Sequence, residues 1–190
     1  MENTKKMNNE MMIKICKGIL ISAILCMLLC AFLPYATATE KYRKTIEKYE
    51  NEKAISGLDY TCGDLYNVSM IEFVNINQVV TDDGNAYKII FGCILGFAAI
   101  AGVCAFFGKS IRTLVFTLLS YGMFWFQSAD FESRKVVPSD NYKWSVAYYI
   151  YIIAVVIVIA FAIVMKVYVV KKKKELRQLE IERINNVDTM

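Results

Sequence analysis

Residues Lys143–Val170 read KWSVAYYIYIIAVVIVIAFAIVMKVYVV and form the longest apolar run of the chain. No charged residue, Gly or Pro occurs from Trp144 to Met165. At about 1.5 Å per residue, a helix of this length crosses a hydrocarbon core of about 30 Å. The tract Ile152–Val164 is apolar on every side, whereas a surface helix of a soluble protein has a polar face. The stretch therefore predicts a transmembrane helix in an integral membrane protein.

The residues that flank this run indicate its orientation. Trp144 and three tyrosines crowd its first turns, as aromatic residues do at a membrane interface. Lys171, Lys172, Lys173 and Lys174 follow its end and are typical of a cytoplasmic anchor. These lysines would also attract anionic lipid, at about 1 kcal/mol per residue near the surface.

Three further apolar runs complete a predicted all-α bundle of four transmembrane helices. We expect the spans at 13–35, 88–108, 113–129 and 144–170. The other segments are a cytoplasmic N-terminus (1–12), an extracytoplasmic segment of helix with some strand (36–87), an outer loop (130–143) and a basic cytoplasmic tail (171–190).

The first apolar run, Gly18–Leu33, has two interpretations. It is either an uncleaved span that ends near Pro34 or a signal peptide cleaved after Ala38. The basic residues before it and the small residues of Ala36-Thr37-Ala38 fit a signal peptide. Its length and its terminal Pro and Tyr fit a membrane anchor, which we favour.

The outer segment contains two elements that the sequence predicts. Glu40–Ile55 has apolar residues at helical spacing and an i,i+4 pair of opposite charge, which predicts a helix. Met70–Val80 alternates in part between apolar and polar residues, which predicts a short strand. Asp82-Asp83-Gly84-Asn85 is typical of a turn.

Charge counts predict the topology. With both termini inside, the inner segments hold 13 of the 22 Lys and Arg residues and 6 of the 18 acidic residues. The outer segments hold the other 9 basic and 12 acidic residues. Basic residues concentrate on the cytoplasmic side of membrane proteins. We therefore expect a multi-pass protein of the plasma (cell) membrane with cytoplasmic N- and C-termini.

Small residues follow one face of the second span. Gly92, Gly96 and Ala99 are spaced by four and three residues, so they share one side of a helix. Small residues let helices approach closely in lipid. The face would pack against the third span, as we favour, or against a second copy of the chain.

Six cysteines are present, and five of them fall in or beside predicted spans. None of the six has the Cys-x-x-Cys spacing of redox and metal sites. Cys62 is the only one in the outer segment. A lone outer cysteine predicts a free thiol or an intermolecular disulfide.

Missing residue types restrict the possible functions. The chain has no His, and no charged residue lies in the middle of a predicted span. Proton relays, ion-coupled transport and intramembrane catalysis rely on such groups. We therefore expect no enzyme activity, no cofactor, no metal and no nucleic-acid partner. The expected partners are the lipid bilayer and another membrane protein or a second copy.

Three short motifs carry a resemblance to other proteins. Phe32-Leu33-Pro34-Tyr35 ends the first span, Ile55-Ser56-Gly57-Leu58 follows outside, and the fourth span begins SVAYYIYII. The chain resembles a loose group of small, largely uncharacterised four-span membrane proteins of low-GC Gram-positive bacteria. The resemblance implies an uncleaved first span, and no functional residues transfer from it.

The function that these features favour is non-enzymatic. We expect an accessory, structural or sensing protein that acts through protein contacts. The alternative is a small transporter or a subunit of one, against which the lack of charged residues within the spans argues.

Overall fold

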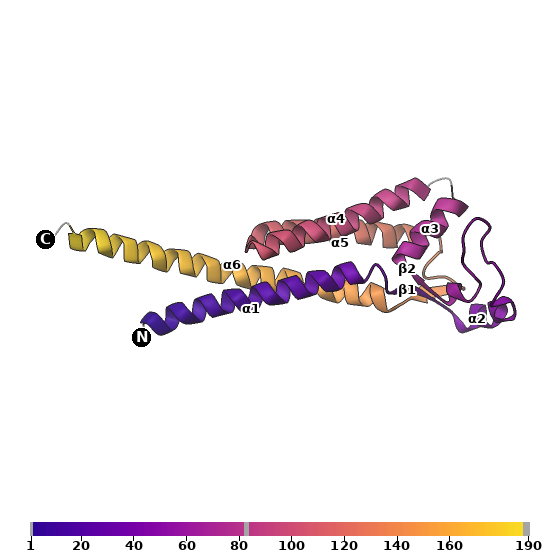
Figure 1. The fold of residues 1–190 in the computed structure, drawn as a ribbon, viewed down its shortest axis with the longest axis horizontal. Helices are drawn as coiled ribbons and strands as arrows, with labels where there is room; N and C mark the ends of the chain where they lie inside the picture. Colours follow the sequence, from indigo (N-terminus) through magenta and orange to yellow (C-terminus); the bar gives the residue numbers. More distant parts are fainter. Residues whose placement is uncertain (1, 82–83, 188–190) are drawn as a thin grey trace.

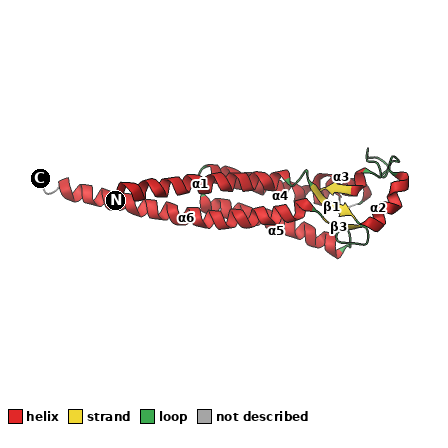
Figure 2. Cartoon of the chain, turned by 90° about the horizontal axis from the view of Figure 1, so that it is seen from below, coloured by secondary structure: helices red, strands yellow, loops and turns green. Residues whose placement is uncertain are grey.

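The computed structural model describes residues 2–81 and 84–187, which form a long rod (Figure 1). Four long helices run along the rod, and a small sheet with short helices closes one end. Both termini lie toward the opposite end (Figures 1 and 2). We call these ends the sheet end and the terminal end.

The elements are α1 (Glu2–Leu29), β1 (Pro34–Ala38), α2 (Glu40–Ile46), the 3-10 helices Glu47–Tyr49 and Asp64–Tyr66, β2 (Asn67–Ser69), α3 (Met70–Val80), α4 (Gly84–Phe106), α5 (Ser110–Ser133), β3 (Tyr142–Trp144) and α6 (Val146–Val187).

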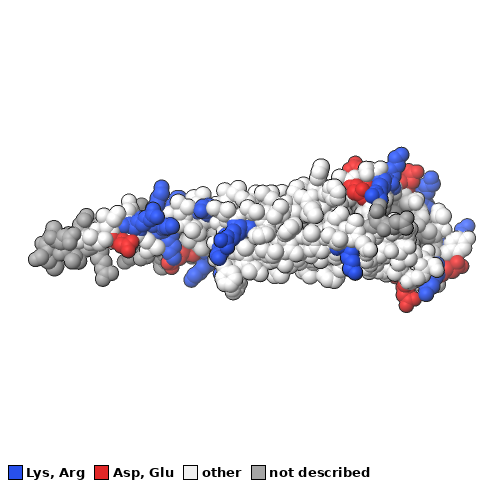
Figure 3. Space-filling model, turned by 90° about the horizontal axis from the view of Figure 1, so that it is seen from above, with Lys and Arg blue, Asp and Glu red and all other residues white. Residues whose placement is uncertain are grey.

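Three helices of the described chain are long and apolar enough to cross a membrane. These stretches are Asn9–Leu29 of α1, Gly84–Phe106 of α4 and Val146–Ile181 of α6. The chain thus has the composition of a multi-span membrane protein, as the sequence predicts. On the face drawn in Figure 3, charged side chains form two groups, one at the sheet end and one along the terminal half of the rod, and the stretch between them is almost free of charge.

The fourth long helix, α5, is less apolar than the other three. It has 24 residues and packs beside α4 and α6 in the same bundle (Figure 2). It is not among the helices that are apolar enough to span by composition. The reason is that α5 carries a row of Ser, Thr and Gln side chains.

The small sheet joins the first and last long helices at the sheet end. Its strand order is β2-β1-β3, and both pairings are antiparallel. In the central strand, Ala36 lies opposite Val68 on one side and Trp144 on the other. Ala36 is fully buried and Ala38 is 6% exposed. Only Ser145 separates β3 from α6, so the sheet continues almost directly into the bundle.

The predicted end of the first span at residue 35 is wrong, because α1 already ends at Leu29. Four residues later, Pro34 begins the central strand. Proline lacks an amide hydrogen and disfavours the helical conformation in the residue before it, here Leu33. The segment that looked like the outer end of a helix therefore forms part of the sheet. At its other end, α1 already begins at Glu2, within the predicted N-terminal segment 1–12.

The predicted strand at Met70–Val80 is wrong, because this segment is the helix α3. The Ser69 hydroxyl accepts the Glu72 amide hydrogen at 3.3 Å, and the Glu72 carboxylate accepts that of Ser69 at 2.7 Å. This reciprocal capping box satisfies two amide groups that a helix start leaves unpaired. The motif Ser-x-x-Glu at Ser69–Glu72 indicates the start of a helix, whereas the partial alternation of apolar and polar residues after it suggested a strand.

Other boundaries also differ from the predictions. The helix expected over Glu40–Ile55 ends earlier, at Ile46, and a 3-10 turn follows it. The span expected from 88 begins at Gly84, and the one expected over 113–129 is part of the longer Ser110–Ser133. Asp82 and Asp83, half of the predicted turn, lie outside the described residues.

The last helix is far longer than a membrane crossing needs. α6 has 42 residues, and about 20 residues suffice to cross the hydrocarbon core. It runs without a break from the sheet to beyond the four lysines, so the predicted tail at 171–190 continues the span as one helix through Val187. Figure 1 shows α6 and the start of α1 projecting past the α4–α5 turn.

The position of β1 predicts that the N-terminal helix is retained. Cleavage after Ala38 would detach the buried central strand together with α1, which packs along α6. The purified protein should therefore have an intact mass near 21.7 kDa. Mass spectrometry that instead finds a mature N-terminus at Thr39 would show that the first run is a signal peptide.

Candidate functional site

The polar side chains of α5 form one continuous row inside the bundle. They recur at helical spacing, so they share one face of the helix. We call this row the α5 seam; its members are all at most 5% exposed and are Ser110, Thr113, Thr117, Ser120, Gln127 and Ser128. The opposite face of α5 is apolar and exposed, with Ile111, Val115, Leu118, Leu119, Trp125 and Phe126. This arrangement is the reverse of a helix on a soluble protein, whose polar face is outside.

Ser120 joins three helices in the middle of the seam. Its hydroxyl donates to the Ile94 carbonyl oxygen of α4 at 2.6 Å and lies 2.7 Å from the Tyr151 hydroxyl of α6. A serine hydroxyl has one hydrogen to donate. Tyr151 must therefore be the donor to Ser120. The Tyr151 ring also stacks on Phe124, with centroids 4.1 Å apart.

Tyr35 joins the sheet to the bundle in a similar way. Its hydroxyl lies 2.8 Å from that of Ser128, which itself donates to the Phe124 carbonyl oxygen at 2.8 Å. Tyr35 is therefore the donor, by the same count of hydroxyl hydrogens. Its ring is fully buried. Five aromatic rings lie within 6.3 Å of it, centroid to centroid, from α3, α5, β3 and α6: Phe73, Phe124, Phe131, Trp144 and Tyr148.

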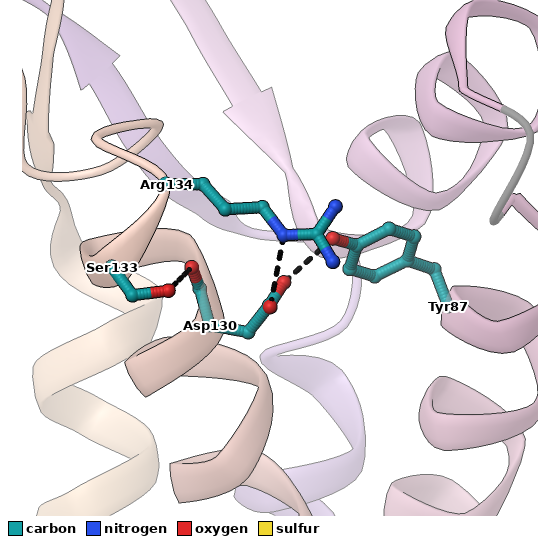
Figure 4. A network of polar contacts seen from close by, with 4 residues as sticks. All are labelled: Tyr87, Asp130, Ser133 and Arg134. Atoms are coloured by element: carbon teal, nitrogen blue, oxygen red, sulfur yellow. Dashed lines mark hydrogen bonds and ion pairs between the residues drawn. The ribbon is translucent and has the colours of Figure 1, made fainter.

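A charged network covers the sheet end of α5 (Figure 4). The Tyr87 hydroxyl of α4 donates to the Asp130 carboxylate at 2.6 Å, and Arg134 Nε donates to the same carboxylate at 3.0 Å. The Arg134 guanidinium also lies 5.7 Å from the centre of the Tyr87 ring. Because Asp130 and Arg134 are partly exposed, their ion pair contributes little alone. The network fixes α4 against α5 where the bundle meets the sheet.

The tyrosine of β3 holds the outer segment onto the sheet. The Tyr142 hydroxyl donates to the Leu65 carbonyl oxygen at 3.0 Å, and its ring packs against Tyr42 and Phe73. Burial raises the pKa of the Tyr142 phenol well above its ordinary value. The phenol therefore stays neutral and keeps its donor hydrogen at physiological pH.

Three buried polar atoms of the seam have no hydrogen-bond partner among the described residues. They are the Thr117 hydroxyl oxygen and both amide atoms of Gln127. An unsatisfied buried polar group costs roughly 1–3 kcal/mol. These two side chains are therefore the positions where the seam reduces the stability of the bundle.

The chemistry that the seam supports is hydrogen bonding between helices. Ser120 and Ser128 each donate their single hydrogen to a main-chain carbonyl oxygen. A nucleophilic serine would instead donate to a neighbouring base. The described residues contain no group of three or more His, Cys, Asp and Glu side chains that could hold a metal ion.

The small-residue face predicted on α4 does not pack against α5. A side chain added at Gly92 or Gly96 would meet nothing within 4 Å, and Ala99 is exposed. The face that is buried instead carries Ile94, Ala98, Ala101 and Ala105. Two faces of α4 carry small residues, the predicted one and the one with Ala98, Ala101 and Ala105. The spacing of residues does not show which of the two faces the neighbouring helix. Contact between copies through Gly92, Gly96 and Ala99 stays a prediction.

The other predicted site residues lie apart from the seam. Cys62 is half-buried in the outer segment, where its amide donates to the Glu52 carbonyl oxygen at 2.9 Å. Lys172 pairs with Glu10 of α1 at 2.7 Å. Lys171, Lys173 and Lys174 are exposed on the projecting part of α6.

Reasoning from the sequence missed the seam. A local signal existed, because Ser110, Thr113, Thr117 and Ser120 are spaced by three, four and three residues. That regular spacing of polar residues within an apolar run predicts a helix with a polar face.

No family model matches the chain, and no curated protein or solved structure matches it either. The resemblance to small four-span proteins therefore stays a prediction.

The hydrogen bond between Ser120 and Tyr151 should be measurable by a double-mutant cycle. Ser120→Ala and Tyr151→Phe should each destabilise the bundle by roughly 0.5–2 kcal/mol, because Ser120→Ala leaves the buried Tyr151 hydroxyl without its acceptor and Tyr151→Phe removes the donor of the same bond. Their combined effect should be smaller than the sum of the two, since both remove the same bond. Chemical unfolding in detergent would measure the three values.

Tyr149→Phe provides the control, because Tyr149 is the same residue type, on the same helix, and 55% exposed. Its effect should be small and should add to that of Ser120→Ala. Additive effects for the Tyr151 pair as well would contradict the assigned bond.

Proposed function

We propose that the protein is a non-enzymatic accessory or sensing protein of the cell membrane, which acts through protein contacts. In this proposal α5 also crosses the membrane, as the third of four spans, the sheet end is extracytoplasmic and both termini are cytoplasmic. The observation that carries the proposal is α6, one unbroken helix of 42 residues that connects the sheet to the projecting tail.

The orientation of α5 supports its assignment as a span. Its exposed face is apolar and its polar face is buried against the other helices. In hydrocarbon there is no water to satisfy polar side chains, so they turn toward neighbouring helices. The same helix outside a membrane would expose a row of large apolar side chains to water.

The distribution of charge supports the orientation of the whole bundle. The basic run Lys171–Lys174, together with Lys109 of the α4–α5 turn and Arg112 at the start of α5, lies on the side of the bundle that faces away from the sheet (Figure 1). The outer segments have more acidic than basic residues. Basic residues near span ends favour the cytoplasmic side.

The connection between the two ends supports a sensing or accessory role. The Ser145 amide donates to the Tyr35 carbonyl oxygen at 2.9 Å, so the residue directly before α6 is bonded to the central strand. At the far end, Asn9 of α1 donates to Glu175 of α6 at 2.8 Å, beside the pair of Glu10 with Lys172. A displacement of the sheet would therefore be transmitted to the projecting pair of helices.

Exposed apolar side chains on the tail are the proposed contact surface. Leu176, Leu179 and Ile181 follow the four lysines and are 38–58% exposed. In this topology they lie beyond the membrane, so lipid does not cover them. A partner protein that binds there would bury them.

The proposal predicts protein contacts at the two ends of the rod. A photo-reactive amino acid at Leu179, or at the exposed Tyr49 of the outer segment, should form discrete protein adducts in intact cells. The control position is Ile153, which is 58% exposed in the apolar middle of α6 and should give lipid adducts only. If neither end forms a protein adduct, the protein does not act through stable contacts.

A transport role is the second candidate, and the unpaired atoms of Thr117 and Gln127 are the observation that favours it. Buried polar groups without partners could bind a solute that passes along α5. Uptake or efflux that is lost on deletion, and is not restored by a Gln127→Met variant, would favour this role. The accessory role predicts that Gln127→Met restores the wild-type phenotype and slightly stabilises the bundle.

A further inference from the structure

A cavity with three cations opens at the terminal end of the bundle. Its volume is about 310 Å³, and it lies between the α4–α5 turn and α6. Lys109, Arg112 and Lys166 line it, and none of the three forms an ion pair with an acidic residue of the described chain. No acidic side chain lines the cavity. The site is therefore positively charged and lacks a counter-ion from the described part of the protein.

The start of α5 adds hydrogen-bond donors to the cavity. The helix has no side-chain cap, and its first return bond runs from the Thr113 amide to the Lys109 carbonyl oxygen. The amides of Ser110, Ile111 and Arg112 therefore have no carbonyl partner among the residues described. Unpaired amides at the start of a helix favour an anion.

Ser110 is a second and independent sign of a ligand. Its side chain is only 5% exposed, yet it has no hydrogen-bond partner within the described chain. The residue lines the charged cavity and also a neighbouring one. Its hydroxyl is therefore in place to bind a group that enters from outside the protein.

The neighbouring cavity is apolar. It has a volume of about 150 Å³ and shares Ser110, Ile111 and Lys166 with the charged one. Its other lining residues, on α5 and α6, are Leu114, Ala162, Ile163 and Val167. Ile111 and Ile163 are more than half exposed, so this groove opens on the outer surface of the bundle. A charged pocket thus continues directly into an apolar groove.

We propose that this pair of cavities binds one anionic phospholipid. The phosphodiester lies among Lys109, Ser110, Arg112 and Lys166, and one acyl chain lies in the groove between α5 and α6. A free phosphate would use the charged pocket but leave the groove empty. A basic pocket between membrane helices, at the level of the headgroups, is a typical site for an anionic lipid.

The bound lipid would hold the start of α5 against α6. This is the end of α5 that lies furthest from the Tyr35 and Asp130 contacts, which fix the helix at the sheet end. The site is therefore separate from the proposed protein-contact surfaces and does not depend on them.

Lipid-dependent thermal stability of the purified full-length protein, together with native mass spectrometry, tests the proposal. The probes are phosphatidylglycerol, zwitterionic phosphatidylcholine with the same acyl chains, and soluble glycerol 3-phosphate. Phosphatidylglycerol should stabilise the protein and remain bound in one copy. The other two should do neither at equal concentration.

Two variants within the cavity and one matched control outside it test whether the lipid binds at this site. Arg112→Gln with Lys166→Gln should weaken binding of phosphatidylglycerol roughly 25-fold, at about a factor of five for each cation removed. The matched control, Lys173→Gln with Lys174→Gln, removes the same charge from exposed positions outside the cavity and should leave binding nearly unchanged. Ser110→Ala should weaken binding without any change in net charge.

Any one of three other results would contradict the proposal. Equal stabilisation by glycerol 3-phosphate would show a site for soluble anions. Equal stabilisation by phosphatidylcholine would show only apolar contact. An equal loss of phosphatidylglycerol binding in the control variant would show that the lipid is attracted by surface charge in general. Thermal stability without lipid checks that the variants are folded.

Discussion

The structure depends on one constraint: the hydroxyl and amide groups on the polar face of α5 must find hydrogen-bond partners inside the bundle. A hydroxyl or amide in hydrocarbon finds no water, so it must bond to another helix or remain unpaired at a cost. Ser120 and Ser128 meet this requirement through Ile94, Tyr151, Tyr35 and their own helix. These bonds fix the rotation of α5 and place α4 and α6 around it. Thr117 and Gln127 show where the requirement is not met within the described chain.

The sheet is connected to the bundle through the same helix. Tyr35 belongs to the central strand, yet its hydroxyl donates to Ser128 of α5, and its ring lies among aromatic rings of α3, α5, β3 and α6. Edge-to-face aromatic pairs each contribute about 0.5–1.5 kcal/mol beyond the burial of their area. The outer segment is therefore an extension of the bundle core rather than a separate domain on a linker. A displacement of the central strand would therefore act on α6 through the contact between the Tyr35 and Tyr148 rings.

The sequence predicted the features that depend on local composition. The run at 144–170 and the apolar runs near 13–35 and 88–108 correspond to α6, α1 and α4, because apolar length alone indicates a spanning helix. The predictions from sequence were wrong where a short local motif conflicted with the broader pattern of apolar and polar residues. At Met70 the capping box overrode the apparent alternation, and at Pro34 the chain left the helix for the sheet.

The candidate site could be predicted only in part, because spacing shows which residues share a helix face but not whether that face is buried. The spacing of Ser110, Thr113, Thr117 and Ser120 places them on one face, but only the packing of α4 and α6 shows that this face is buried. The same limit applies to α4. Gly96 and Ala98 both lie within a stretch rich in small residues, and tertiary contacts alone bury Ala98 and leave Gly96 open.

The lipid exposure of α5 in vesicles tests most directly whether this helix crosses the membrane. Single cysteines that carry a spin label, in a background without the six native cysteines, would be placed at 115, 117, 118, 119 and 120. Oxygen, which concentrates in lipid, should reach labels at Val115, Leu118 and Leu119 and should largely miss Thr117 and Ser120. A water-soluble relaxation reagent should reach none of them. If that reagent reached Val115 or Leu118, α5 would lie in water and would not be one of four membrane spans.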